Sequence, residues 1–244
     1  MVECFINEIT VKTFSKNFSQ ILFRLICKII FTIYAPVHSL GKGNLPTGPF
    51  ILCSNHSSHL DMGVLIHASG RLSSDFAVLV AMDYWFKASF FKKIFRNFLT
   101  LIPVDRISKK KNKKKIFSFE NTINVCNVFV KNKGNLIIYP EGSRSQNGLI
   151  QPFKKGAAIL ALRLNIPIVP VYIHGCFKAL PKGRKLMKPA NIHVYFEKPI
   201  YPPYDATKLE DFNATSFKEE AINRLTSKIE KKVRNLKKTY GVNI

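Results

Sequence analysis

Acidic residues are scarce in this chain of 244 residues, which has 15 Asp and Glu against 38 Lys and Arg and a formal net charge of +23. This excess of cations predicts contact with something negative: phospholipid headgroups, nucleic acid or a phosphorylated substrate. A compositional drift of the encoding genome toward Lys, Asn, Ile and Phe would also raise the charge, so the sign alone does not choose a partner. The hydrophobic content of 46% suffices for a full core, which argues against disorder.

Cysteines are few, and none of the five belongs to a C-x-x-C pair. The sequence therefore predicts neither a disulfide framework nor a thiolate zinc site, and it favours a reducing compartment. A G-x-S-x-G elbow is also missing, so nothing indicates a serine nucleophile on a strand-to-helix turn. Glu3 stands where a secretory leader has a basic start, so no signal peptide is expected.

The chain also lacks a long apolar run free of charge. The nearest candidate, residues 18–37, carries Arg24 and Lys28 near its middle, and a central cation costs about 2.5–3.5 kcal/mol on insertion scales. This pattern favours an amphipathic helix at the membrane interface over a helix packed on the domain or a true span. We expect residues 1–44 to form this membrane-associating segment with a connector, and residues 45–244 to form one domain.

The rest of the chain alternates between short apolar runs and stretches with helical spacing. This order predicts an α/β fold with a mainly parallel mixed sheet flanked by helices, where ligands bind beyond the carboxyl ends of strands. Residues 222–240 have apolar positions three or four apart, which predicts an amphipathic helix whose basic face meets solvent or a membrane. We expect strands at 50–54, 76–81, 98–104, 136–139, 168–173 and 192–196, and helices at 60–68, 83–95, 115–130 and 154–164.

A histidine and an aspartate five residues apart, His56 and Asp61, follow the first expected strand. One continuous helix would place these side chains about 140° apart, but a loop that leads into a helix can bring them together. Asp61 would then fix the tautomer of the imidazole and raise its basicity, which predicts a general base. Two alternatives stay open: the pair only caps a helix, or His56, His59 and Asp61 ligate a metal.

A second polar cluster, Glu141-Gly142-Ser143-Arg144, follows a later strand. Gly142 lets the backbone approach a ligand closely, and the guanidinium of Arg144 matches a phosphate or a carboxylate. Glu141 can accept a hydrogen bond from a substrate hydroxyl, although a surface ion pair with Arg144 is the alternative. Arg106, directly after another strand, offers a second guanidinium, for which its neighbour Asp105 is an equally good partner.

Four segments of the chain resemble the four motifs of the glycerolipid acyltransferases, in the same order and with roughly the same spacing. The chain is similar to a lysophosphatidic acid (1-acylglycerol-3-phosphate) acyltransferase of the bacterial type, over about residues 45–200. The resemblance implies that His56 is the general base and Asp61 its partner, and that other motif residues line the site for the glycerol phosphate. The segments are His56-x4-Asp61, Val104-Asp105-Arg106, Glu141 to Ser145 and Ile168 to Tyr172; the implied substrate-binding residues are Arg106, Glu141, Gly142, Ser143, Arg144 and Pro170.

The resemblance further implies transfer of a fatty acyl group from an acyl thioester, acyl-CoA or acyl carrier protein, to 1-acylglycerol-3-phosphate. It implies no metal or other cofactor, and a place at the anionic surface of a membrane, on its cytoplasmic face. Two residues depart from the family pattern: Ser143 replaces the usual Thr, and Met82 stands where many relatives carry a Lys thought to hold phosphate. Another acceptor, such as a different lysophospholipid or an acylated amino-acid lipid, therefore stays open.

The lysine runs favour a competing class, a non-catalytic basic module that binds membranes or nucleic acid. Only nine of the 38 cations are arginine, and no zinc-finger or RNA-binding aromatic signature is present, so nucleic acid is not expected as a partner. An acyl chain needs an apolar groove, for which the aromatic residues between Tyr84 and Phe91 are candidates. Ordinary core packing is the alternative for these aromatics.

Overall fold

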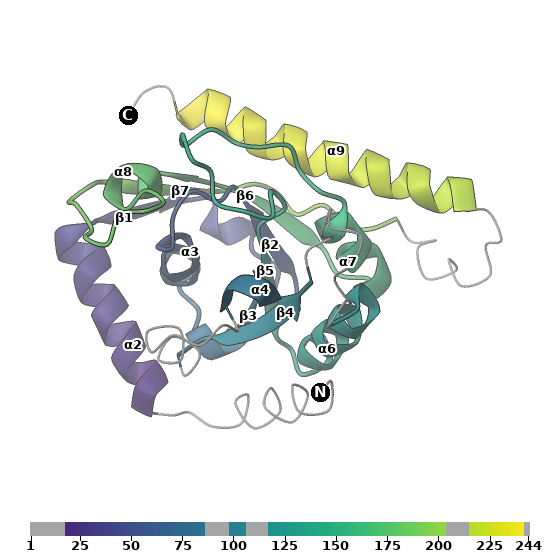
Figure 1. The fold of residues 1–244 in the computed structure, drawn as a ribbon, viewed down its shortest axis with the longest axis horizontal. Coiled ribbons are helices and arrows are strands. Elements are labelled where there is room, and N and C mark those ends of the chain that lie inside the picture. Colours follow the sequence, from purple (N-terminus) through teal and green to yellow (C-terminus); the bar gives the residue numbers. More distant parts are fainter. Residues whose placement is uncertain (1–17, 86–97, 106–116, 204–214, 242–244) are drawn as a thin grey trace.

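The computed structural model describes residues 18–85, 98–105, 117–203 and 215–241 (Figure 1). Among them, seven strands form one sheet with the order β1-β7-β6-β2-β5-β3-β4. The β6–β7 pair is antiparallel and every other neighbouring pair is parallel, which confirms the predicted mainly parallel mixed sheet. The strands are β1 Val37–Leu40, β2 Ile51–Ser54, β3 Phe76–Ala81, β4 Thr100–Val104, β5 Asn135–Ile138, β6 Ile168–His174 and β7 Ile192–Phe196.

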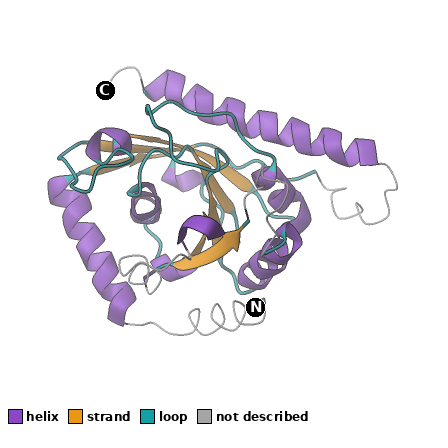
Figure 2. Ribbon diagram, viewed as in Figure 1, coloured by secondary structure: helices purple, strands orange, loops and turns teal. Residues whose placement is uncertain are grey.

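Helices cover both faces of the sheet, as Figure 2 shows. Alternate residues of β2 point to opposite faces, because side chains alternate along a strand. Ile51 and Cys53 belong to an apolar cluster with α6, α7 and α9, whereas Leu52 belongs to a second cluster with α2 and α3. The helices are α2 Phe18–Ile29, α3 Asp61–Ser69, α4 Met82–Trp85, α6 Phe119–Lys131, α7 Gly156–Leu164, α8 Cys176–Ala179 and α9 Thr215–Tyr240, with short turns at Ile30–Tyr34, Lys42–Asn44 and Ser73–Asp75.

The strand β1, Val37–Leu40, lies in the segment that the sequence assigns to a connector, where no strand is expected. These four residues pair with Ile192–Tyr195 of β7 at the edge of the sheet. The strand stops at Gly41, whose φ is +78° and where a Cβ atom would lie 2.2 Å from the carbonyl oxygen of Phe196. A partner about 150 residues away therefore makes this short, mostly exposed segment a strand.

One predicted helix begins later in the structure, and of another only the first residues are described. The helix expected at 115–130 is α6, and it begins at Phe119 because the hydroxyl of Ser118 accepts a hydrogen bond from the N–H of Asn121 at 3.1 Å. For the helix expected at 83–95, the structure describes α4, Met82–Trp85, and residues 86–97 lie outside the described ones. The aromatic residues proposed for an acyl groove fall largely in that stretch.

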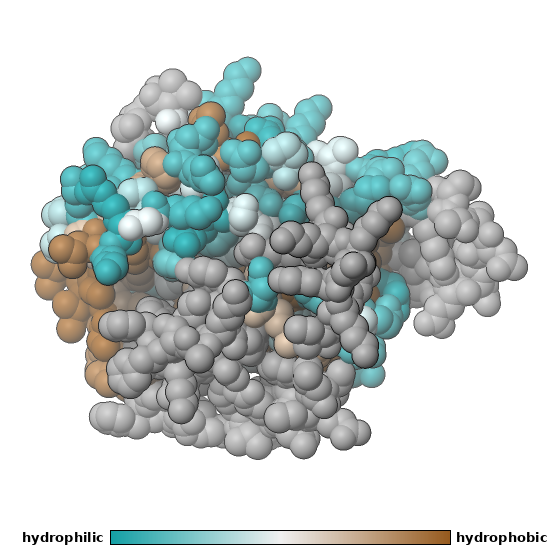
Figure 3. Space-filling model, in the orientation of Figure 1, coloured by the Kyte–Doolittle hydropathy of each residue, from teal (hydrophilic) through white to brown (hydrophobic). Residues whose placement is uncertain are grey.

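The N-terminal helix α2 packs on the domain along one side only. The buried ring of Phe31, just after α2, lies 5.4 Å from the imidazole of His67 in α3. The opposite side leaves large apolar side chains in solvent, seen as the brown patch at the left of Figure 3. None of the described helices is both long and apolar enough to cross a bilayer. The exposed apolar residues are Ile21, Leu22, Leu25, Ile26, Ile29, Ile33 and Tyr34.

Candidate active site

Residues singled out from the sequence follow four strands at one edge of the sheet. His56 follows β2, Glu141 follows β5, Met82 follows β3 and Asp105 follows β4. These four strands are parallel neighbours, so their carboxyl ends meet at the same edge. Arg106, the next residue after Asp105, lies outside the described residues.

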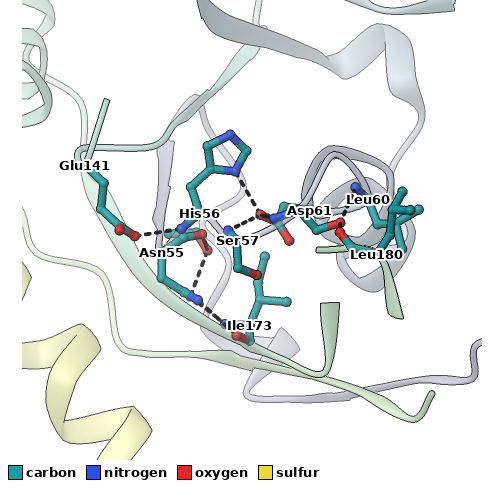
Figure 4. A network of polar contacts seen from close by, with 10 residues as sticks. Asn55, His56, Ser57, Leu60, Asp61, Glu141, Ile173 and Leu180 are labelled. Carbon is teal, nitrogen blue, oxygen red and sulfur yellow. Dashed lines mark hydrogen bonds and ion pairs between the residues drawn. The ribbon is translucent and has the colours of Figure 1, made fainter. Parts of the chain in front are cut away.

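The side chains of His56 and Asp61 meet, as the loop-to-helix passage predicts. The Nδ1 atom of His56 lies 2.8 Å from Oδ2 of Asp61, which is fully buried at the first position of α3 (Figure 4). The same oxygen accepts hydrogen bonds from the N–H groups of Ser57 at 2.7 Å and Ser58 at 2.8 Å. These bonds fold the loop tightly around the carboxylate and fix the distance between the two side chains.

The orientation of the imidazole follows from its two neighbours. In the neutral imidazole the proton belongs on Nδ1, which faces a carboxylate, and Nε2 then has its lone pair toward the open side. The ring also lies flat against the ring of Tyr139. With 17% of its side chain exposed, His56 can still reach a substrate. This is the arrangement that a general base needs.

Glu141 holds two backbone segments together. Its Oε1 atom accepts a hydrogen bond from the N–H of His56 at 2.7 Å, and its Oε2 atom accepts one from the N–H of Gln151 at 2.9 Å. Burial raises the pKa of the carboxyl group to about 7, although these two bonds pull it in the opposite direction. The bond from the N–H of Ser145 to the carbonyl of His56, 2.8 Å long, ties the same turn to the loop of the base. Glu141 thus positions His56 by its main chain, and a contact between Glu141 and substrate stays a prediction.

The turn after Glu141 has the backbone shape that its glycine predicts. Gly142 adopts a φ of +73°, in the left-handed region that other residues rarely enter, and its N–H donates to the carbonyl of Tyr139 at 3.0 Å. Ser143 is exposed and Arg144 is half-buried at the far side of this turn. The turn that carries Ser143 and Arg144 is thus joined to the loop of His56 through the N–H of Ser145.

Pro170 lies inside the sheet instead of at its edge. It is buried in the middle of β6, opposite Cys53 of β2, and its carbonyl accepts a hydrogen bond from the N–H of Glu197 at 3.0 Å. Its role in shaping a substrate wall stays a prediction. Among the described residues, no three His, Cys, Asp or Glu side chains gather into a group able to hold a metal.

Three further side chains support the site through contacts that the sequence does not predict. The amide of Asn55 donates to the carbonyl of Ile173 at 3.0 Å and accepts from its N–H at 2.8 Å, which locks the end of β2 to β6. The hydroxyl of Ser58 donates to the carbonyl of Leu180 at 2.7 Å. Burial raises the pKa of the Cys176 thiol, and the charge and hydrogen bonding of Asp61 raise it further, so the thiol stays neutral beside the carboxylate.

Residues 36–174 match the family model described as Acyltransferase. The chain is 26% identical over 193 residues to a chloroplastic 1-acyl-sn-glycerol-3-phosphate acyltransferase of Brassica napus, covering 77% of this chain and 52% of that protein. It is 25% identical over 188 residues to a probable 1-acyl-sn-glycerol-3-phosphate acyltransferase of Mycoplasma genitalium, covering 74% and 67% of the two chains. The chain thus spans about half the length of the plant relative.

The fold is similar to that of a solved structure as well. The crystal structure of the 1-acyl-sn-glycerophosphate acyltransferase PlsC from Thermotoga maritima superposes with a TM-score of 0.67 at 19% sequence identity. The match covers 98% of this chain and 89% of that one. At this identity the likeness concerns the fold.

Proposed function

This chain belongs to the Acyltransferase family, and from that premise we propose that it transfers a fatty acyl group from an acyl thioester to the free hydroxyl of 1-acylglycerol-3-phosphate, giving phosphatidic acid. The observation that carries the proposal is the 2.8 Å contact between His56 and Asp61 beside the turn of Glu141 to Ser145. A base that is oriented by a carboxylate can activate a hydroxyl, and the turn offers a guanidinium for a phosphate. The relatives that match most of this chain carry names of the same activity.

In the proposed mechanism, His56 acts through Nε2. This atom takes the proton from the acceptor hydroxyl while the hydroxyl oxygen attacks the thioester carbonyl carbon. Backbone N–H groups hold the negative charge on the tetrahedral oxyanion, the carbon–sulfur bond then breaks, and the thiolate leaves and recovers the proton from the imidazolium. Asp61 stabilises the positive charge that His56 carries between the two proton transfers. General base action supplies about 10²- to 10⁴-fold, so positioning of both substrates supplies much of the remaining rate.

Arg144 and the main chain around Gly142 would hold the phosphate of the acceptor, with Arg106 added from the motif alone. The second candidate acceptor is another lysophospholipid or an acylated amino-acid lipid. Met82 favours it, because the resemblance to the family implies a cation at this position and Met82 is apolar. Both acyl-CoA and acyl carrier protein stay open as donors, and no resident cofactor is part of the proposal.

We also propose that the exposed side of α2 rests on an anionic membrane. Arg24 and Lys28 are exposed beside its apolar side chains. The apolar side chains would contact the lipid tails, and the two cations would contact the acidic headgroups. Outside this N-terminal segment, the apolar side chain of Leu186 is 82% exposed in the loop after α8. This loop is joined to the end of the N-terminal helix because the hydroxyl of Tyr34 donates to the carbonyl of Met187 at 3.0 Å.

The test is an acyl transfer assay on a panel of acceptors. Purified protein is mixed with labelled acyl-CoA or acyl carrier protein and anionic vesicles that contain 1-acylglycerol-3-phosphate, other lysophospholipids or an uncharged monoacylglycerol. We expect labelled phosphatidic acid as the main product. Acylation of another lysolipid but not of 1-acylglycerol-3-phosphate would support the alternative acceptor, and no transfer to any acceptor would overturn the proposal.

A further inference from the structure

The carboxyl end of β3 offers no cation at the position that Met82 occupies. Met82 begins α4 directly after β3, and its side chain packs against the apolar cluster on the α6 and α7 side of the sheet. The neighbouring strand β5 leads into the turn that carries Gly142 and Arg144. A phosphate monoester carries about two negative charges near neutral pH, so a further cation beside Arg144 would strengthen its binding at this turn.

Lys154 brings such a charge to the turn. A Cβ atom on Gly142 would lie 2.6 Å from Nζ of Lys154 and 3.2 Å from its Cε, so the side chain folds directly over this glycine. The ammonium group thus lies beside Gly142, two residues before Arg144 in the same turn. The N–H of Ser145 connects this turn to the carbonyl of His56. An amine and a guanidinium beside one glycine turn are donors that suit a phosphate.

The main chain that carries Lys154 is fixed at three points. The N–H of Gln151 donates to Glu141, the N–H of Phe153 donates to Oε2 of Glu230 at 3.0 Å, and the N–H of Lys154 donates to the carbonyl of Pro140 at 2.9 Å. These bonds connect the segment to the loop after β5 and to α9. The position of Lys154 over the turn is therefore built by its surroundings, and a ligand would not have to order this backbone.

The next residue provides a contrast. Nζ of Lys155 forms an ion pair with Glu219 of α9 at 2.9 Å, which engages its charge on the protein surface. Lys154, also exposed, makes no ion pair with any acidic side chain in the part of the chain that the structure describes. Two adjacent lysines thus differ in direction and in pairing, and the unpaired one lies over Gly142.

We propose that Lys154 binds the phosphate of the acceptor lipid together with Arg144, and so supplies the charge that Met82 does not. This assignment deepens the proposed function, on which the identity of the acceptor rests. It makes Lys154 a residue that selects a phosphate monoester over an uncharged glycerolipid. A phosphate bound between Lys154 and Arg144 would lie on the turn that the N–H of Ser145 joins to the carbonyl of His56.

Equilibrium binding tests the assignment without any need for catalysis. The protein is titrated with 1-acylglycerol-3-phosphate in neutral detergent micelles, and with uncharged 1-acylglycerol as the second probe. We expect Lys154→Met to weaken binding of the phosphorylated lipid about tenfold, or ~1.4 kcal/mol, and to leave the uncharged lipid unaffected. Lys154→Arg should retain most of the affinity. Lys155→Met removes the same charge one residue away and should bind both lipids as the unmodified chain does.

Kinetics provide an independent second measurement. Lys154→Met should raise the KM for 1-acylglycerol-3-phosphate and leave the KM for the acyl donor unchanged. Equal binding of the phosphorylated lipid by Lys154→Met and Lys155→Met would overturn the assignment, whether or not acyl transfer occurs. Binding that depends on Lys154 in a protein without acyl transfer would preserve the phosphate site and overturn the proposed function instead.

Discussion

The imidazole of His56 stacks on the ring of Tyr139, with centroids 4.0 Å apart and planes inclined by 15°. The Tyr139 ring packs against one face of the imidazole. The carboxylate of Asp61 fixes the rotation of the imidazole through Nδ1. The hydroxyl of Tyr139 is buried and has no hydrogen-bond partner in the part of the chain that the structure describes. The ring and the hydroxyl of this tyrosine should therefore have separable effects.

Replacement of Tyr139 tests this separation. Tyr139→Phe keeps the stack and removes a buried unpaired hydroxyl, so we expect unchanged turnover and an equal or higher melting temperature. Tyr139→Leu removes the flat wall and should lower kcat about tenfold through a misplaced imidazole, since small displacements of a catalytic group are costly. The two variants are compared by steady-state kinetics and thermal unfolding. Equal loss of kcat in both would assign the effect to the hydroxyl.

Replacement of His56 tests the proposed base directly. His56→Ala should lower turnover by about 10²- to 10⁴-fold, which is the usual contribution of a general base. Because the side chain is partly exposed and its N–H bond to Glu141 is made by the main chain, folding and vesicle binding should be retained. Circular dichroism and vesicle sedimentation provide the controls. Retained turnover in a folded variant would remove His56 from the mechanism.

The buried carboxyl of Glu141 predicts a pH dependence of stability. Its pKa rises from 4.5 to about 7 on folding, so the folded state holds the proton more tightly than the unfolded state. The stability that this proton contributes is complete below the unfolded pKa, and it is lost as the pH rises from about 4.5 through about 7. Urea unfolding at pH 5, 6, 7 and 8 measures this slope.

The control for this slope is Glu141→Gln, which cannot titrate. We expect it to be less stable overall, because an amide nitrogen would face one of the two backbone N–H groups that the carboxylate now binds. Its stability should nevertheless vary less with pH between 5 and 7 than that of the unmodified chain. Parallel pH profiles for the two proteins would contradict the raised pKa.

The exposed side of α2 predicts how the protein attaches to lipid. The side chains of Ile29, the last residue of α2, and of Ile33, in the short helix Ile30–Tyr34 that continues it, are 60% and 77% exposed, so Ile29→Asp and Ile33→Asp should not disturb folding. Each should lower binding to anionic vesicles about tenfold or more, by loss of buried apolar area and by repulsion from the headgroups. Leu149→Asp is the matched control, at a side chain that is 53% exposed and lies outside α2. An equal effect of all three variants would indicate that net charge alone controls attachment.

The sequence predicts the site best where the residues are close along the chain. The meeting of His56 and Asp61 follows from a five-residue step across a loop and a helix start, and the left-handed turn follows from Gly142. Contacts between distant residues carry no such local signal. The lock between Asn55 and Ile173 joins residues 118 positions apart, and β1 exists only through its pairing with β7.

Lys154 shows why charged positions are hard to assign from sequence. Lys154 and Lys155 are neighbours with identical side chains, and either one reads as part of a solvated basic face. Which of the two covers Gly142 depends on the hydrogen bonds that fix residues 151–154, and on Glu219, which engages Lys155 from a helix far along the chain.

The hydrogen bond from Ser58 to Leu180 has a mechanical consequence. Leu180 opens the loop that carries Leu186 and that Tyr34 grips through the carbonyl of Met187. The loop that carries His56 and the segment that follows α2 are therefore both hydrogen-bonded to the same stretch, residues 180–187. If α2 rests on a membrane as proposed, the depth at which it lies in the lipid would set the height of His56 above the acyl chains. The membrane surface would thus determine the height at which the acceptor hydroxyl meets His56.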